Sequence, residues 1–189
     1  MKQLLEEKTR AVNSLFGKLD RHISAFKRYS GLRCPAGCGE CCLKQDLEAT
    51  VLEFLPAAHS LLLKGECDPV LERIHEKTDA CCVFFNPFGK QGNCSVYGER
   101  GLICRLFGFS AREDKHGTRT LVTCPVIKES IRYRDAATAV DHAPNLSSYY
   151  LRLYGIDPEL SVRYLPVNQA IKKAIELTLF QSSFRKRPA

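Results

Sequence analysis

Apolar side chains recur at every third or fourth position along residues 2–29, among charged and polar residues. The stripe comprises Leu4, Leu5, Val12, Leu15, Phe16, Leu19, Ile23 and Phe26. This spacing brings all of them to one face of an α-helix. Ser30 and Gly31 interrupt the pattern, so we predict one long amphipathic helix that ends there and packs this face over the core.

A helical pattern returns after the first group of cysteines, in two shorter stretches. The inward positions of the first stretch, which begins at Asp46, are Leu47, Val51, Leu52 and Leu55. Pro56 is expected to kink this second helix or to begin a new turn. The segment "CDPVLERIHEK", from Cys67, offers Asp68 as an N-cap and Pro69 at the first helical position. We therefore predict a third helix there.

Between residues 82 and 125 the pattern changes to short apolar runs separated by turn residues. "CVFFNPFGKQGNCSVY" (82–97) has Asn, Pro and Gly in its middle, and "LFGFSAREDKHGTRTLVTCP" (106–125) has a polar turn around Asp114 and Gly117. Each segment predicts a β-hairpin. Helical periodicity returns in residues 126–189, most clearly in "NQAIKKAIELTLFQSSF".

These elements predict a mainly α fold with small β-hairpins, of the α+β class. A chain of 189 residues is close to the size of one domain. We therefore expect a single domain over residues 1–189. In it, an N-terminal helix (1–31) and a C-terminal helical region (126–189) pack against a cysteine-cluster metal-binding region (32–125).

Composition indicates a globular protein, because hydrophobic residues make up 44% of the chain and charged residues 26%. The N-terminus lacks the apolar stretch of a secretory signal. The longest apolar runs, such as "LLL" at 61–63, fall far short of the roughly 20 residues that span a bilayer. We expect a cytoplasmic protein without membrane contact. In that reducing compartment, closely spaced cysteines are more typical of metal sites and redox centres than of disulfides.

The net charge of +7 lies mainly at the two ends, since residues 1–33 carry +5 and residues 168–189 carry +4. Basic ends can contact nucleic acid or acidic partners. Basic and aromatic residues do not interleave here as they do in known nucleic-acid modules. We therefore interpret the basic ends as solvated helix faces and do not expect nucleic acid as the main partner.

Four of the ten cysteines fall within nine positions, in "CPAGCGECC" at residues 34–42. They are Cys34, Cys38, Cys41 and Cys42. Gly37 and Gly39 would permit the tight turn that brings such near neighbours around one ion. Thiolates are soft ligands, so an all-cysteine set selects Zn²⁺, Cu(I) or an iron–sulfur cluster. Four of them complete a Zn²⁺ site or hold one [4Fe–4S] cluster.

Adjacent Cys41 and Cys42 should point apart on an extended backbone. We therefore expect the pair to serve two centres, or to leave one thiol in the core, with further ligands coming from downstream. The best downstream segment is "NCSVYGERGLICR", which contains Cys94 and Cys104. The remaining candidate ligands are Cys82 and Cys124.

Arg100 and Arg105 lie between and beside these downstream cysteines, with Tyr97 nearby. A site with four thiolates is anionic, and guanidinium groups would offset its charge and donate to sulfur. The alternative is that both are ordinary surface arginines or partners of carboxylates.

In their order, these segments resemble a known family. "CPAGCGECC", then "CVFFN", then "GNCSVYGERGLICRLFGF" is typical of the zinc- or iron-chelating cysteine-cluster family, also called the YkgJ-like or CxxCxxxxCC domain. The resemblance covers residues 32–125 and implies a zinc or iron cofactor, as an ion or a [4Fe–4S] cluster. It implies metal ligands among Cys34, Cys38, Cys41, Cys42, Cys82, Cys94 and Cys104, with Cys124 as an eighth. Tyr97, Arg100 and Arg105 match the non-cysteine positions of the family and are implied to bind the cofactor.

The sequence departs from the pattern of the family at three places. Three residues instead of two separate Cys34 from Cys38, Gly101 stands where the family usually has proline, and Cys81 doubles Cys82. These departures affect the geometry of the first cysteine pair and the choice between Cys81 and Cys82.

The first hypothesis for function is therefore a metal-binding protein that holds zinc or iron for structural support, storage or transfer. An alternative is an iron–sulfur enzyme with an electron-transfer or protein-modifying role, because flagellin lysine N-methylase is a relative of the resembled family. A further alternative is a zinc-supported nucleic-acid-binding module. No catalytic residue is identified, since the five histidines are scattered and no GxGxxG-like loop follows a strand. A protein partner is also possible on the sequence alone.

Overall fold

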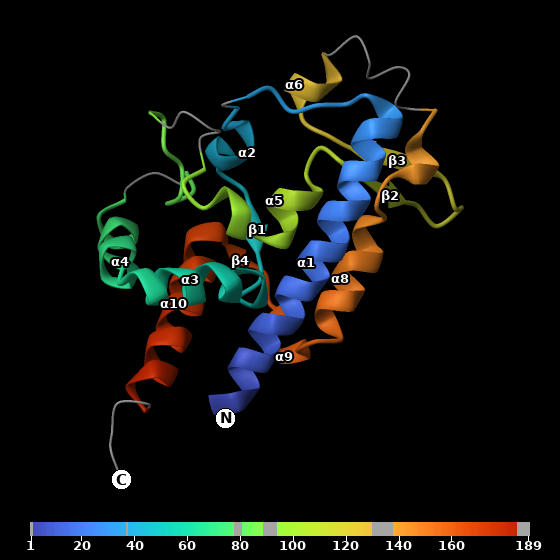
Figure 1. Ribbon diagram of the computed structural model, residues 1–189. Coiled ribbons are helices and arrows are strands. Elements are labelled where there is room, and N and C mark those ends of the chain that lie inside the picture. Colours follow the sequence, from blue (N-terminus) through green and yellow to red (C-terminus); the bar gives the residue numbers. More distant parts are fainter. Residues whose placement is uncertain (1, 37, 78–80, 89–93, 130–137, 185–189) are drawn as a thin grey trace.

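A computed structural model describes residues 2–36, 38–77, 81–88, 94–129 and 138–184. The first helix, α1 (Lys2–Ser30), runs the length of the molecule (Figure 1). Its predicted apolar face is buried, from Val12 through Phe16 to Phe26. The backbone leaves the helix at Gly31, which has a φ of 69° that favours glycine. The predicted first helix is confirmed.

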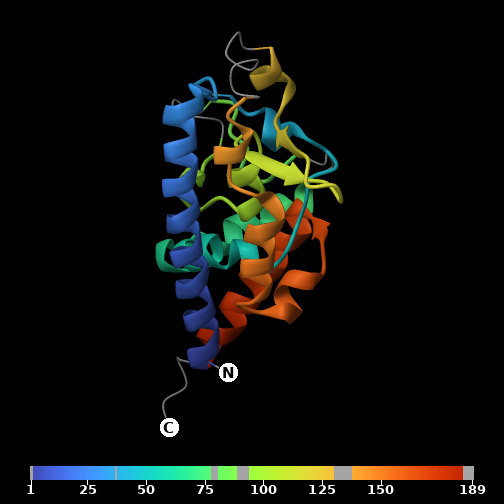
Figure 2. The ribbon, with the colours of Figure 1, turned by 90° about the vertical axis from the view of Figure 1, so that its right-hand side faces the viewer.

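Helices lie on two sides of the buried face of α1. On one side α3 (Leu55–Lys64) packs against α1, and α4 (Cys67–Glu76) and α10 (Val167–Ser183) pack against α3. On the other side, α8 (Leu146–Tyr154) runs beside α1 in both views (Figures 1 and 2). Large side chains from these helices fill one continuous core, for example Leu19, Leu55 and Ile175.

The sequence predicted a helix that begins at Asp46, and this predicted start is wrong. The chain instead forms a strand, β1 (Glu48–Ala49), and a 3₁₀ turn, η1 (Leu52–Phe54), before α3 begins at Leu55 with Pro56 in its first turn. The carboxylate of Glu53 accepts hydrogen bonds from the backbone N–H (2.9 Å) and the hydroxyl (3.1 Å) of Thr50. These bonds support a local turn in place of a continuous helix.

The predicted third helix is confirmed as α4, but its N-cap is Glu66 and not Asp68. Asp68 lies one position inside the helix, next to Pro69. A carboxylate in the first turn still interacts favourably with the helix dipole, which explains why the sequence pattern placed the start two residues late.

The second predicted hairpin is confirmed as β2 (Ser110–Glu113) and β3 (Arg119–Val122), which pair antiparallel. Its turn contains Asp114, whose side chain accepts the N–H groups of His116 (2.8 Å) and Thr118 (2.9 Å). Gly117 takes a φ of 80° in the same turn. Asx turns of this kind favour a tight reversal between two strands.

The first predicted hairpin is much smaller than expected. In the described residues it consists of one bridge between Phe85 and Cys94 and a hydrogen bond from the Ser95 N–H to the Phe84 carbonyl (2.8 Å). The expected turn residues Gly89 and Gly92 lie outside the described part of the chain.

A second small sheet was not expected from the sequence. It pairs β1 antiparallel with β4 (Leu165–Pro166), more than a hundred positions away, with Ala49 opposite Leu165. The Val167 N–H also donates to the Leu47 carbonyl (2.9 Å). These contacts fix the start of α10 against the segment that follows the first cysteines.

Short helices complete the fold. They are α2 (Glu40–Leu43), η2 (Tyr97–Glu99), α5 (Leu102–Leu106), α6 (Pro125–Lys128), η3 (Val140–His142) and α9 (Pro158–Val162). The described structure is thus mainly helical with two small antiparallel sheets, as the predicted fold class requires. Within the described residues, every helix is too short or too polar to traverse a lipid bilayer.

Candidate metal centre

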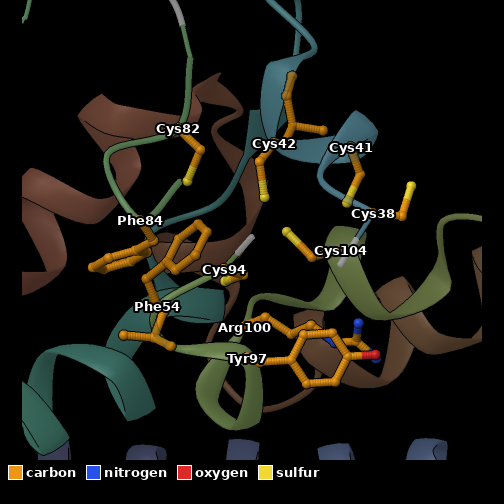
Figure 3. A pocket seen from close by; sticks show the side chains of 12 residues that line it. Cys38, Cys41, Cys42, Phe54, Cys82, Phe84, Cys94, Tyr97, Arg100 and Cys104 are labelled. Atoms are coloured by element: carbon orange, nitrogen blue, oxygen red, sulfur yellow. The ribbon is translucent and has the colours of Figure 1, made fainter. Parts of the chain in front are cut away.

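Six cysteines line one small cavity (Figure 3). They are Cys38, Cys41, Cys42, Cys82, Cys94 and Cys104, and all six are free thiols. Two come from α2, one from α5, and the others from the segments around the Phe85–Cys94 bridge and before α2. The cavity has a volume of about 30 Å³, and its remaining walls include Phe54, Phe84 and Arg100. Segments distant in the sequence therefore converge on one thiol-rich space.

The knuckle that carries Cys41 and Cys42 is a single helical turn and not the extended backbone we expected. In α2 the Cys42 N–H donates to the Gly39 carbonyl (2.8 Å). Successive side chains diverge less in a helix than in a strand, so both thiols face the same cavity. Gly39 has an ordinary φ of −114°, so the turn does not use its left-handed freedom. Gly37, the other expected turn glycine, lies outside the described residues.

Cys82 is held by hydrogen bonds on both sides. Its own N–H donates to the Cys42 carbonyl (3.0 Å), which fixes the two cysteines side by side through the backbone. The side-chain amide of Asn168 accepts the Val83 N–H (2.8 Å) and donates to the Cys81 carbonyl (2.9 Å). Asn168 lies in the first turn of α10, so the C-terminal helix holds the backbone around Cys82.

Cys104 is oriented by the start of α5. There Glu53, which is fully buried, accepts the Ile103 N–H through its second oxygen (2.9 Å). Gly101 precedes the helix and leaves room for this contact, since a Cβ at that position would lie 3.0 Å from the Phe54 ring and 3.3 Å from the Glu53 carboxylate. A buried carboxylate thus caps the helix that presents Cys104 to the cavity.

The thiols interact with one another across the cavity. Cys42 forms hydrogen bonds with Cys41 and Cys94. These bonds raise the pKa of Cys42, and they lower the pKa values of Cys41 and Cys94. Burial raises the pKa of Cys82 to about 12 and that of Cys104 well above its usual range. Cys82 and Cys104 are therefore protonated at neutral pH in the metal-free fold.

The thiols are gathered but not arranged as a coordination shell. Across the described ranges, no group of three or more His, Cys, Asp or Glu side chains has the arrangement needed to hold a metal ion. Binding an ion would therefore require loss of thiol protons and rotation about the Cα–Cβ bonds, which moves the sulfur atoms. The donor set itself suits zinc or iron, because six of the side chains lining the cavity are thiols and none is a carboxylate.

Arg100 lies at the wall of the cavity, together with Tyr97 (Figure 3). Its guanidinium group stacks over the Tyr97 ring at 4.1 Å from the centroid, and its buried Nε has no hydrogen-bond partner. Its positive charge contributes to the lowered pKa values of Cys41 and Cys94, after the hydrogen bonds from Cys42. Arg100 thus lies where it can offset thiolate charge.

Arg105 has different surroundings, although it follows Cys104 directly. Its guanidinium forms an ion pair with Asp20 and donates to the carbonyls of Gly98 and Arg100. It also lies over the Phe16 ring at 4.6 Å. The structure places Arg105 between α1 and the 97–101 turn, outside the lining of the cavity.

Two of the eight expected ligands, Cys34 and Cys124, do not line the cavity. Cys34 is exposed and lies in hydrogen-bond contact with Cys38, and it interacts electrostatically with Cys41 and Cys124. Cys124 is buried at the start of α6. The two therefore belong to an outer group that meets the cavity thiols at Cys38 and Cys41.

Two residues that position the cavity were missed in the sequence. The sequence could have indicated the role of Glu53, because this residue is the single acid among the apolar positions of "VLEFLP" and a buried acid needs hydrogen-bond partners. The sequence gives no indication of the role of Asn168, because asparagine is common at the start of a helix and the residue that it contacts lies far away in the sequence.

Comparison with known proteins gives one finding. Residues 33–125 match the model of a family described as "CxxCxxCC: Putative zinc- or iron-chelating domain". The motifs predicted a range of 32–125. The matched segment starts one residue later, at residue 33, and ends at the same residue, 125. Neither the curated proteins nor the solved structures contain a match to the chain.

Proposed function

Because this chain belongs to the zinc- or iron-chelating CxxCxxCC domain family through residues 33–125, we propose that it binds a single zinc or iron ion in the thiol-lined cavity. The ligands would be four thiolates from five cysteines that face one another. They are Cys41, Cys42, Cys82, Cys94 and Cys104. Cys38, with Cys34 and Cys124, would form the outer part of the site.

The chemistry of the donors supports this proposal. Thiolate is a soft ligand, and a set of four completes tetrahedral zinc or iron coordination. When bound, the ion would link α2, α5 and the segments around Cys82 and Cys94. Hard cations such as Ca²⁺ and Mg²⁺ prefer oxygen ligands, above all carboxylates, and no carboxylate lines the cavity.

The size of the cavity favours one ion over a [4Fe–4S] cluster. A water molecule needs at least about 10–15 Å³ in this measure of volume. The cavity, at about 30 Å³, offers room for roughly two such spheres. That space suits a single ion, whereas a four-iron cluster would require the walls to move apart.

The surroundings of the thiols also support an anionic, metal-binding state. Arg100 supplies positive charge beside Cys41 and Cys94. Asn168 and Glu53 hold the segments that carry Cys82 and Cys104. Partners of this kind raise metal affinity because they fix the ligands in place before the ion binds.

Metal analysis of protein purified without oxygen tests the proposal. We expect about one zinc or iron ion per chain, and a colourless or weakly coloured protein without the broad absorption of a [4Fe–4S] cluster. The double variant Cys42→Ser, Cys94→Ser should lose the ion. Cys67→Ser is the matched control, because Cys67 is buried, as Cys42 is, but lies outside the cavity. Full metal content in the double variant would show that the ligand set is wrong.

A further inference from the structure

The face around α9 gathers most of the large apolar side chains that are exposed. Among the described residues, seven of the twelve such side chains lie between residues 151 and 184. They are Leu151, Tyr154, Val162, Tyr164, Leu177, Phe180 and Phe184. Exposed apolar side chains that are scattered singly need no explanation, but a contiguous group of them indicates a binding surface.

This face consists of a ridge between two open grooves. The first groove, the α10 groove, lies between α9 and α10, has a volume of about 580 Å³ and includes Leu177 and Phe180. The second, the α8 groove, has a volume of about 570 Å³ and includes Leu151 and Tyr164. Val162, at the end of α9, lines both grooves and is 64% exposed. It therefore projects between them as a ridge.

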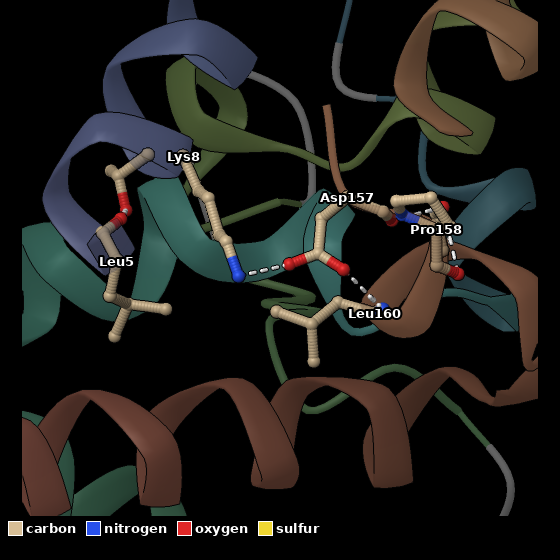
Figure 4. A network of polar contacts seen from close by, with 7 residues as sticks. Leu5, Lys8, Asp157, Pro158 and Leu160 are labelled. Atoms are coloured by element: carbon tan, nitrogen blue, oxygen red, sulfur yellow. Dashed lines mark hydrogen bonds and ion pairs between the residues drawn. The ribbon is translucent and has the colours of Figure 1, made fainter. Parts of the chain in front are cut away.

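Polar contacts of Asp157 hold the start of α9, the short helix that carries Val162 at its end (Figure 4). Asp157 caps α9 by accepting the Leu160 N–H (2.9 Å), and its other oxygen forms an ion pair with Lys8 of α1. The hydroxyl of Ser161 donates back to the Asp157 carbonyl (2.5 Å). A surface that is fixed before binding loses little conformational entropy when a partner docks.

The charges around the grooves are balanced. The α10 groove carries two acidic and two basic side chains, and the α8 groove carries one of each. They are Glu159, Glu176, Arg163 and Lys173 in the first groove, and Glu48 and Arg112 in the second. Although the chain as a whole has a net charge of +7, the described residues that line the two grooves carry no net charge, so the grooves lack the positive excess that would attract nucleic acid or an acidic peptide. A surface with the same alternating signs is its electrostatic complement.

We propose that this face binds a second copy of this chain in a two-fold symmetric dimer. In a two-fold interface the same patch is used on both copies, so a ridge must meet a groove and an acid must meet a base. The Val162 ridge of each copy would enter a groove of the other, with Glu159 and Glu176 facing Arg163 and Lys173. The proposal goes beyond metal binding and does not depend on it.

Analytical ultracentrifugation of the full chain in a thiol reductant, across the micromolar concentration range, tests the dimer. The wild-type protein should sediment as a dimer. Val162→Asp and Phe180→Asp should each raise the dissociation constant by about 30-fold or more, the effect of a strong interface residue. Leu63→Asp is the matched control: Leu63 is 74% exposed on α3, outside both grooves, so the dimer should persist.

Charge exchange tests whether the partner is a second copy. An acidic variant (Arg163→Glu, Lys173→Glu) and a basic variant (Glu159→Lys, Glu176→Lys) should each be monomeric, because like charges then meet. Their equimolar mixture should form a mixed dimer. Circular dichroism checks that each variant is folded. A monomeric wild-type protein, a Val162→Asp dimer of unchanged affinity, or a mixture that does not associate would each overturn the proposal.

Discussion

Arg100 and Arg105 show how much the surroundings of a single side chain decide its effect. Arg100 has an unpartnered, buried Nε beside the thiols, whereas the guanidinium of Arg105 is occupied by Asp20 and two backbone carbonyls. A charge that is already paired adds little to the potential at a neighbouring site. The two arginines should therefore separate metal affinity from stability when each is replaced.

Arg100→Gln should weaken metal binding by about tenfold, the low end of the effect of residues that support metal ligands. The physical reason is that the glutamine no longer offsets thiolate charge at Cys41 and Cys94. Competition with a chromophoric chelator measures the change. Arg105→Gln is the control: it should lower the free energy of unfolding by about 1–3 kcal/mol through lost hydrogen bonds. If the two variants lose metal affinity equally, the separate roles are wrong.

Asp157 should make the free energy of unfolding depend on pH in the acid range. Burial acts to raise the pKa of this carboxyl, but the hydrogen bonds from Lys8 and Leu160 outweigh it and hold the pKa below 3.8. A carboxyl whose folded-state pKa is depressed contributes stability above its ordinary pKa and loses it as the pH falls through the folded-state value.

Asp157→Asn should remove this acid-dependent contribution and keep the α9 cap, since asparagine caps nearly as well as aspartate. Asp157→Ala should also lose the cap and cost about 1 kcal/mol more at neutral pH. Urea unfolding at neutral pH and at about pH 3 measures both effects. If the wild-type protein and Asp157→Asn differ in free energy of unfolding by the same amount at both pH values, the proposed role of the Asp157 charge is wrong.

At the scale of secondary structure elements, α10 belongs to the metal centre although it lies outside the matched family segment. Its first turn supplies Asn168, and its start is fixed to the chain after α2 by the β1–β4 pairing. The helix therefore supports both the knuckle with Cys41 and Cys42 and the segment with Cys82. A terminal helix with this role should affect metal affinity without contacting the ion.

Asn168→Leu should lower metal affinity by about 10-fold to 100-fold, because the backbone around Cys82 would lose two hydrogen bonds. The matched control is Gln169→Leu, the exposed neighbour on the same helix. Chelator competition gives the affinity, and thermal unfolding without metal shows whether the fold is intact. Equal affinities for the two variants would remove Asn168 from the site.

The elements that the sequence predicted well are those whose stability is local. The α1 stripe and the β2–β3 turn each contain their own signal, in a helical repeat and in the Asp114 and Gly117 turn. Contacts between distant residues set the others. The β1–β4 pair displaced the helix expected from Asp46, and α2 turned a supposed extended pair of cysteines into a helical one. The gathering of cysteines was predictable from composition and motif, but the amide that holds Cys82 was not.

For the whole molecule, ion binding and folding should be coupled. The proposed ligands come from α2, from the segments around Cys82 and Cys94, and from α5, so an ion would cross-link separate segments of the core. Saturating metal should raise the melting temperature, by an amount that grows with the logarithm of free metal concentration. A chelator should reverse the increase. The Cys42→Ser, Cys94→Ser variant is the control, because added metal should leave its melting temperature unchanged.

The affinity should rise with pH. Cys82 and Cys104 have raised pKa values in the metal-free fold, so they hold protons that the ion must displace. Each proton released makes the apparent affinity about tenfold stronger per pH unit. Calorimetry in buffers of different ionisation enthalpy would count the protons. A pH-independent affinity between weakly acid and weakly alkaline solution would contradict thiolate ligation.

The contact between Asn168 and the Cys82 segment also has a consequence for biosynthesis. A ribosome makes the chain from its N-terminus, so all the cavity thiols emerge before the residue that clamps Cys82. A nascent chain therefore exposes its thiols while the cavity is still incomplete. If the proposed ion binds here, tight binding is expected only after α10 has been made, because Asn168 lies in its first turn.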